Sequence, residues 1–183
     1  MTSQIPLQDT LDVAVRKFVS LASGLDSELV IPGKDNNPAP NEPYATVENI
    51  ITIGVGIDSE VPTEGPTTTE TTLKHKGTRS ISYSVQFYRE GAADNAEGLL
   101  SYASTTIGQI FLAQNNLTWK RAGDVRNISS VMGSKYEERR SVDIELRYIS
   151  RRTIDINRIG SVEIDLTMSD STDINEVIEV TDA

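Results

Sequence analysis

The chain has 183 residues, of which 37% are hydrophobic, enough for a single domain with its own core. Its formal net charge of −10 argues against nucleic-acid binding, because an acidic surface repels phosphates. It contains no cysteine, no basic and apolar N-terminal leader and no run of about 18 apolar residues, so we expect a soluble, intracellular protein without disulfides or cysteine-based zinc sites.

The N-terminal part is predicted to contain one helix and two strands. Residues 29–31 are typical of a short strand, and residues 44–55 are β-branched and predict a longer one. Residues 32–43 hold four prolines and therefore form a surface connector. An amphipathic helix over residues 7–25 is indicated by apolar residues at three- and four-residue spacing: Leu11, Ala14, Val15, Phe18, Leu21, Ala22 and Leu25.

Residues 56–78 are rich in threonine and glutamate and include Pro62 and Pro66. Since this stretch is too polar to bury a core, we interpret it either as a long mobile loop or as two extended arms of a hairpin joined at residues 64–66. His75, the only histidine, lies here between two lysines. It has no second histidine with which to bind a metal, and we expect it at the surface as a candidate interface residue.

Two segments alternate between apolar and polar residues, the pattern of half-buried strands in an antiparallel sheet. In residues 79–89 the apolar positions are Ile81, Tyr83, Val85 and Phe87. In residues 136–148 they are Val142, Ile144, Leu146 and Tyr148. Residues 154–156 are expected to continue or kink the second strand.

Between these strands the sequence predicts a second helix that follows Gly91 and runs to about residue 114. Asp94 and Glu97 are interpreted as its capping box. A shorter strand is expected within residues 125–131, and Trp119 is expected in the core or in an interface. The apolar stripe of the helix is predicted to comprise Leu100, Ala103, Ile107 and Ile110, with Leu99 and Phe111 beside it.

These elements predict an α+β fold, in which an antiparallel sheet is packed by two amphipathic helices and carries a long β-hairpin or loop arm. We expect one domain over residues 1–158 and an acidic C-terminal strand and tail over residues 159–183. After Arg158 the chain has seven acidic residues and no basic one, and residues 162–168 alternate like another strand or arm. The acidic end is either a solvated tail or a complement to the arginine-rich strand of another copy.

The charged residues that open the second alternating strand are the candidate interface. Glu137, Glu138, Arg139 and Arg140 are interpreted either as a solvent-facing strand surface or as an interface between subunits, to which Arg147 also belongs. No catalytic set accompanies them. Residues 54–56 lack the third glycine of a dinucleotide site, and residues 170–173 lack the glycine of a calcium loop, so we expect no cofactor, no metal and no enzymatic activity.

Short strings in this order of elements resemble a known family. They are Pro43-Tyr-Ala-Thr-Val47, Tyr83-Ser-Val-Gln-Phe-Tyr-Arg-Glu-Gly-Ala92, Gly123-Asp-Val-Arg-Asn-Ile-Ser129 and Tyr136-Glu-Glu-Arg-Arg-Ser-Val-Asp-Ile144. The arrangement is similar to the tail terminator, or neck, proteins of contractile-tailed bacteriophages. The resemblance covers most of residues 7–150 and does not extend to residues 56–78 or to the acidic end.

The resemblance implies a structural virion protein, present in the host cytoplasm during assembly. Six copies would form a ring that caps the tail tube and joins it to the head. The implied partners are the protein itself, as a homohexamer, the tail tube protein, the tail sheath protein and the head–tail connector protein. DNA would pass through the ring without specific binding, as the negative charge suits. The alternatives are another connector or tail tube component and, more distantly, a small soluble enzyme.

Overall fold

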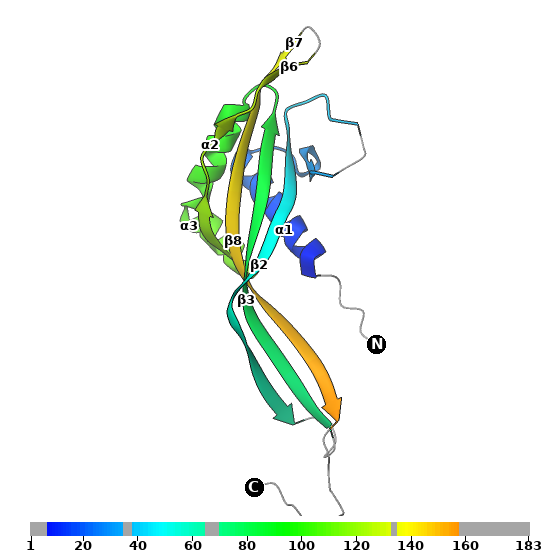
Figure 1. Ribbon diagram of the computed structural model, residues 1–183. Coiled ribbons are helices and arrows are strands. Elements are labelled where there is room, and N and C mark those ends of the chain that lie inside the picture. The colour runs from blue at the N-terminus through cyan, green and yellow to red at the C-terminus, as the bar shows by residue number, and fades with distance from the viewer. Residues whose placement is uncertain (1–6, 35–37, 65–69, 133–134, 158–183) are drawn as a thin grey trace, which may run out of the picture. The chain divides into compact units, whose positions relative to one another are not determined.

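The computed structural model describes residues 7–34, 38–64, 70–132 and 135–157 (Figure 1). By its contacts the chain divides into two compact units, one formed by residues 1–57 and 77–150 and the other by residues 58–76 and 151–183. The predicted boundary at residue 158 lies at the end of the described residues and stays a prediction. The elements in chain order are α1 (Leu7–Ser23), the 3-10 helix η1 (Ser27–Leu29), β1 (Val30–Pro32), β2 (Tyr44–Glu64), β3 (Glu70–Tyr88), α2 (Ala92–Ala103), α3 (Thr106–Gln114), β4 (Leu117–Ala122), β5 (Arg126–Asn127), β6 (Ser130–Met132), β7 (Lys135–Glu137) and β8 (Arg139–Asn157).

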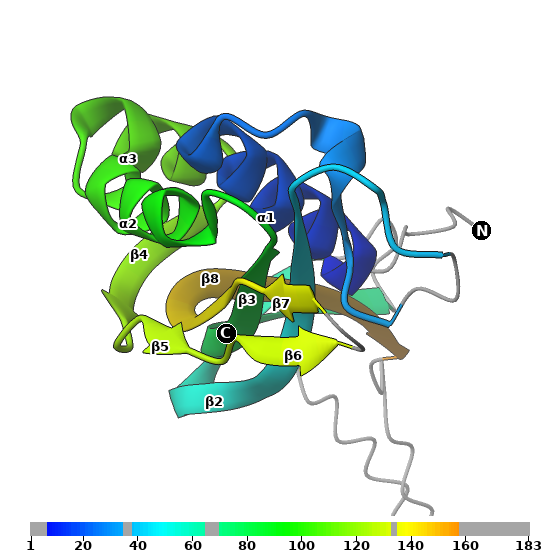
Figure 2. The same cartoon turned by 90° about the horizontal axis from the view of Figure 1, so that it is seen from above.

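The first unit is built on a mixed sheet with helices on one face, as Figure 2 shows. The strand order is β1-β2-β3-β8-β4, and β5 pairs with β8 beside this path. The α+β class is confirmed. The sheet is not purely antiparallel, however, because β1 runs parallel to β2, with Val30 opposite Ala45. The proline-rich connector makes this possible, since two parallel neighbours need a crossover longer than a hairpin turn.

The core lies between the helices and the sheet. The predicted alternation is confirmed, because Ile81, Tyr83, Val85 and Phe87 on β3 are all buried. Phe18 of α1 lies at the centre of an aromatic cluster. Its ring centroid is 5.5 Å from that of Tyr102 and 6.0 Å from those of Phe111 and Trp119. Trp119 therefore packs against the core, which was one of the two locations predicted for it.

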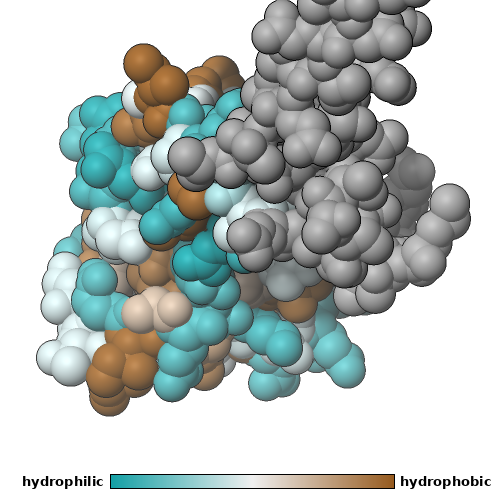
Figure 3. Space-filling view, turned by 90° about the horizontal axis from the view of Figure 1, so that it is seen from below, coloured by the Kyte–Doolittle hydropathy of each residue, from teal (hydrophilic) through white to brown (hydrophobic). Residues whose placement is uncertain are grey.

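The buried side of α1 differs from the predicted stripe by two residues. Val19 is buried, whereas Leu21 is exposed. Other hydrophobic residues also reach the surface, where Figure 3 shows them as separate patches among hydrophilic residues. The residues of α1 in the core are Leu11, Ala14, Val15, Phe18 and Val19.

The single helix predicted up to residue 114 is wrong, because the chain forms α2 and α3 with a break at residues 104–105. Thr105 begins α3 as its N-cap, and its side-chain oxygen accepts a hydrogen bond from the Gly108 amide at 3.0 Å. A Cβ on Gly108 would lie 2.3 Å from the Tyr102 carbonyl oxygen, so only glycine permits this tight junction. Because of the break, α3 does not continue the buried face of α2: Ile107 and Ile110 are exposed, and Leu112 is buried instead.

The predicted capping box is also wrong. The N-cap of α2 is Gly91, in the left-handed conformation with φ of 81°, and no side chain caps the helix there. Asp94 therefore lies inside the first turn instead of in front of it. The glycine has the right backbone freedom for this position, because a residue with a Cβ would be strained at that φ.

In the second unit the described residues are strands. The side chain of Ser59 donates to the Lys76 carbonyl at 3.2 Å, and that of Thr63 donates to the Thr72 carbonyl at 3.0 Å. A residue further along β2 thus contacts a residue further back along β3, which identifies antiparallel pairing of the two strands. The described part of residues 56–78 is therefore not a loop, and its paired strands agree with the hairpin interpretation, whereas most of the predicted joint at residues 64–66 lies outside the described residues. β8 continues through residues 154–156, whereas residues 162–168 lie outside the described part.

Candidate assembly surface

The helices cover one face of the first unit's sheet and leave the other face open (Figure 2). Polar and charged residues of β3 and β8 belong to this open face. They alternate with the core residues of β3 and β8, because successive residues of a strand point to opposite faces. On β8 the inward residues Val142, Ile144 and Leu146 are buried, and Arg147 on the open face is exposed. The residues that alternate with the core positions are Ser80, Ser82, Ser84 and Gln86 on β3 and Asp143, Glu145 and Arg147 on β8.

Glu145 is the centre of a polar cluster on this face. Its carboxylate accepts hydrogen bonds from the Ser80 hydroxyl at 2.5 Å, from Arg121 Nε at 2.6 Å and from the Lys120 ammonium. The side chain of Glu145 is only 11% exposed. The bonds from Lys120, Ser80 and Arg121 lower the pKa of Glu145 to about 2, against the opposing effect of burial. The carboxylate is therefore ionised and fixed in place.

A β-bulge brings both cations to this carboxylate. In a regular strand Lys120 and Arg121 would point to opposite faces. The register between β4 and β8 shifts between Trp119 and Arg121, so that Trp119 opposes Leu146 and Arg121 opposes Glu145. The extra residue lets both cations lie on the open face while Trp119 still points into the core.

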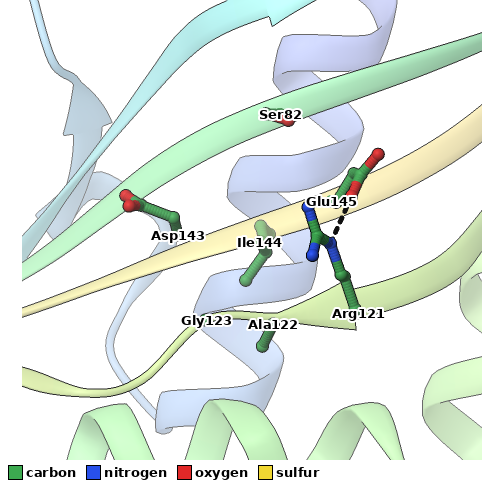
Figure 4. Close-up of a pocket in the computed structure, with 7 residues that line it drawn as sticks. All are labelled: Ser82, Arg121, Ala122, Gly123, Asp143, Ile144 and Glu145. Atoms are coloured by element: carbon green, nitrogen blue, oxygen red, sulfur yellow. Dashed lines mark hydrogen bonds and ion pairs between the residues drawn. The ribbon is translucent and has the colours of Figure 1, made fainter.

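A cavity of about 250 Å³ opens beside this cluster (Figure 4). Arg121 reaches over it to Glu145, and Asp143 on the same strand is held by Arg126 at 2.6 Å. Both carboxylates are thus paired with cations. The lining residues are Ser82, Arg121, Ala122, Gly123, Asp143, Ile144 and Glu145.

A second cluster holds two tyrosines between two arginines. The rings of Tyr44 and Tyr88 are parallel, with centroids 4.5 Å apart. The guanidinium carbon of Arg89 lies 5.8 Å from the Tyr44 ring and that of Arg139 lies 5.1 Å from the Tyr88 ring. Glu137 contacts both arginines, at 2.7 Å from Arg139 Nε and 3.9 Å from Arg89 Nε. Burial, Tyr88 and Glu137 together raise the pKa of Tyr44.

The structure brings four of the six predicted site residues together, but their charges face each other. Arg139 is bound to Glu137, and Arg140 lies 3.5 Å from Glu138. All four side chains are at most 28% exposed. Their part in an interface stays a prediction, and the contacts within the chain account for much of their charge.

Arg147 and His75 lie apart from these four in the chain. Arg147 is exposed on the open face of β8, opposite Thr118 of β4. His75 belongs to β3 in the second unit, not to a loop, and its Nδ1 lies 3.2 Å from a carboxylate oxygen of Glu60. Arg147 is therefore the predicted site residue most accessible to a partner.

Sequence reasoning missed two apolar surfaces. The β6–β7 hairpin places Val131 directly opposite Tyr136, and both side chains are about two-thirds exposed. On β2, Ile50, Ile51 and Ile53 are also exposed. Ile50 and Ile51 are adjacent in the sequence and therefore point to opposite faces of the strand, which is a signal that they cannot both lie on one buried face.

Neither a metal centre nor a membrane segment stands out in the described part of the chain. Its histidine, aspartate and glutamate side chains form no group of three or more that could hold a metal ion. No helix there combines the length and the apolar character that crossing a membrane requires.

Comparison with known proteins places this geometry in context. The family model described as phage neck terminator protein matches residues 9–170, which includes both clusters and the exposed isoleucines of β2. None of the curated proteins compared with the chain matches it.

Proposed function

Because the chain belongs to the phage neck terminator family and is thus a structural protein of the virion neck, we propose that it forms a ring, a homohexamer, that caps the tail tube. The ring would stop growth of the tube and join it to the head connector. Its partners would be the tail tube protein, the tail sheath protein and the connector protein.

The observation that supports this proposal is the one-sided sheet of the first unit. Helices cover one face, and the other carries fixed polar side chains around the 250 Å³ cavity. A sheet face of this kind, with exposed apolar residues at one edge, is typical of a surface that meets another protein. The carboxylates Asp143 and Glu145 are held by cations, so they support contact and not catalysis.

The net charge of −10 supports passage of DNA through the ring without specific binding. A wall that repels phosphates does not retain the duplex. A strongly basic lumen would instead slow the DNA, with an affinity that falls steeply as salt rises.

Native mass spectrometry and negative-stain microscopy of the purified protein test the proposal, both alone and mixed with purified tail tubes. A six-fold ring, in solution or at tube ends, is the expected result. Long tubes made of this protein alone would indicate a tube component instead. A monomer that neither assembles nor binds tube ends would contradict the proposal.

A further inference from the structure

Among the described residues, no strand pairs with the outer edge of β2 in the first unit beyond its first few positions. In the described part of the chain, β1 pairs only with residues 45–47 of β2. The following residues, 49–57, contain no charged residue and no proline. Natural proteins protect a free edge with charges, prolines or short strands, because its unpaired backbone groups accept further strands. This edge has none of these protections.

The side chains on the same edge are apolar and exposed. Ile50, Ile51 and Ile53 are 56%, 52% and 48% exposed, and Ile57 is fully exposed. Such a segment is a strong template for strand addition and would aggregate if it stayed uncovered. The observation therefore points to a strand that covers the edge in the assembled state.

We propose that residues 162–168 of a neighbouring copy add to β2 along residues 51–57 as an extra strand. This inference rests on the proposed ring and names one of its subunit contacts. Both segments are seven residues long and have an apolar residue at every second position. The apolar positions are Ile51, Ile53, Val55 and Ile57 on β2, and Val162, Ile164, Leu166 and Met168 on the added segment.

Charge fits the same arrangement. With the apolar residues aligned, Glu163 and Asp165 lie on the side of the added strand that corresponds to Gly54. A guanidinium nitrogen of Arg79 lies 3.8 Å from the place that a Cβ on Gly54 would occupy. A cation is therefore present on the face of β2 to which Gly54 belongs. The two acids also prevent the segment from pairing with itself, since like charges directly opposite repel.

A neighbouring copy is the proposed donor of the added strand, because a contact between two different patches of one chain, repeated from copy to copy, is the kind that closes into a ring. The experiment below separates this arrangement from pairing within a single chain.

Disulfide cross-linking between two versions of the chain tests the proposal, since the chain has no cysteine of its own. One version carries Ile53→Cys with a first tag, and the other carries Leu166→Cys or Ile164→Cys with a second tag. The two are mixed, oxidised and separated without reductant, while native mass spectrometry follows the ring. Asp165→Cys is the matched control, because its side chain faces the other side of the added strand.

We expect an adduct that carries both tags, at least fivefold stronger with Leu166→Cys or Ile164→Cys than with Asp165→Cys. A ring that forms without this adduct overturns the inference and leaves the proposed function standing. An adduct without a ring supports the strand contact and counts against the hexamer. A version with both cysteines that closes only within single chains also overturns the inference.

Discussion

Glu145 accepts hydrogen bonds from three side chains while its own side chain is only 11% exposed, so its removal leaves Lys120 and Arg121 without their partner. We expect Glu145→Gln to lower the free energy of unfolding by about 1–3 kcal/mol, below the full cost of breaking a buried ion pair because Arg121 is 75% exposed. Urea denaturation at pH 7 measures this. Asp143→Asn is the control, since its pair with Arg126 is largely exposed, and it should cost less than about 1 kcal/mol. Equal effects of the two variants would contradict the assignment.

The same carboxylate makes stability depend on pH. The pKa of Glu145 is lowered from 4.5 to about 2 in the folded chain. Its contribution is therefore fully present above pH 4.5 and is lost as the pH falls toward about 2. We expect the difference in unfolding free energy between the native chain and Glu145→Gln to shrink steadily over this range in denaturation at pH 6, 4 and 3. A difference that stays constant down to pH 3 would show that the charge of Glu145 is not what stabilises the cluster.

Arg139 offers a second test at the scale of a single residue. Arg139→Glu would place a carboxylate beside Glu137 and over the Tyr88 ring, where the guanidinium now lies. We expect a loss of about 1–3 kcal/mol in the free energy of unfolding, measured by urea denaturation. Arg147→Glu, at an exposed position, should change it by no more than about 0.5 kcal/mol. If both charge reversals are neutral, the contacts around Tyr88 contribute nothing to folding.

At the scale of elements, the junction between α2 and α3 depends on Thr105. Its oxygen accepts a hydrogen bond from the Gly108 amide, and its O–H donates one to the Tyr102 carbonyl at 2.7 Å, so one side chain contacts the end of α2 and the start of α3. We expect Thr105→Ala to cost about 0.5–2 kcal/mol, measured by thermal and urea unfolding. Thr106→Ala, one residue further on and also exposed, should have little effect. A larger loss with Thr106→Ala would show that the cap is misassigned.

The sequence predicted the elements whose pattern is set by burial on one face. The alternation of Ile81, Tyr83, Val85 and Phe87 identified β3 correctly, because every second side chain lies in the core. The break at Thr105 was missed because the apolar spacing runs across it, and only the close approach of Gly108 to Tyr102 requires two helices. The parallel pairing of β1 was missed because pairing direction depends on a distant strand.

The candidate site was predicted only in part, for a related reason. The charges around Arg139 are visible in the sequence and pair with each other, but the tyrosine rings beside them come from β2 and β3. The cluster around Glu145 joins Ser80, Lys120 and Arg121, which are 24 to 65 residues away along the chain. The β-bulge that brings Lys120 and Arg121 to one face lies in β4, and nothing in the sequence of that short strand predicts it.

At the scale of the whole molecule, the two units contribute different surfaces to the proposed assembly. The first provides the open sheet face, the free edge of β2 and the β6–β7 hairpin. The second provides paired strands of β2 and β3, in which His75 and Glu60 lie 3.2 Å apart. A polar hairpin of this kind gains little from burial, so its contacts with a partner would depend on hydrogen bonds and charge.

Arg147 separates assembly from folding in the complete chain. It is exposed on the open face of β8, so its charge can be reversed at almost no cost to the monomer. If that face meets a neighbouring copy, Arg147→Glu places a negative charge at a contact in a protein that already carries −10 and weakens the ring through repulsion. We expect at least a tenfold weaker association, measured by mass photometry over a concentration series, with partial recovery at high salt because salt screens charges.

Lys17→Glu, on α1, is the matched charge reversal on the helical side and should leave association nearly unchanged. Equal weakening by both variants would mean that net charge, and not the open sheet face, controls assembly.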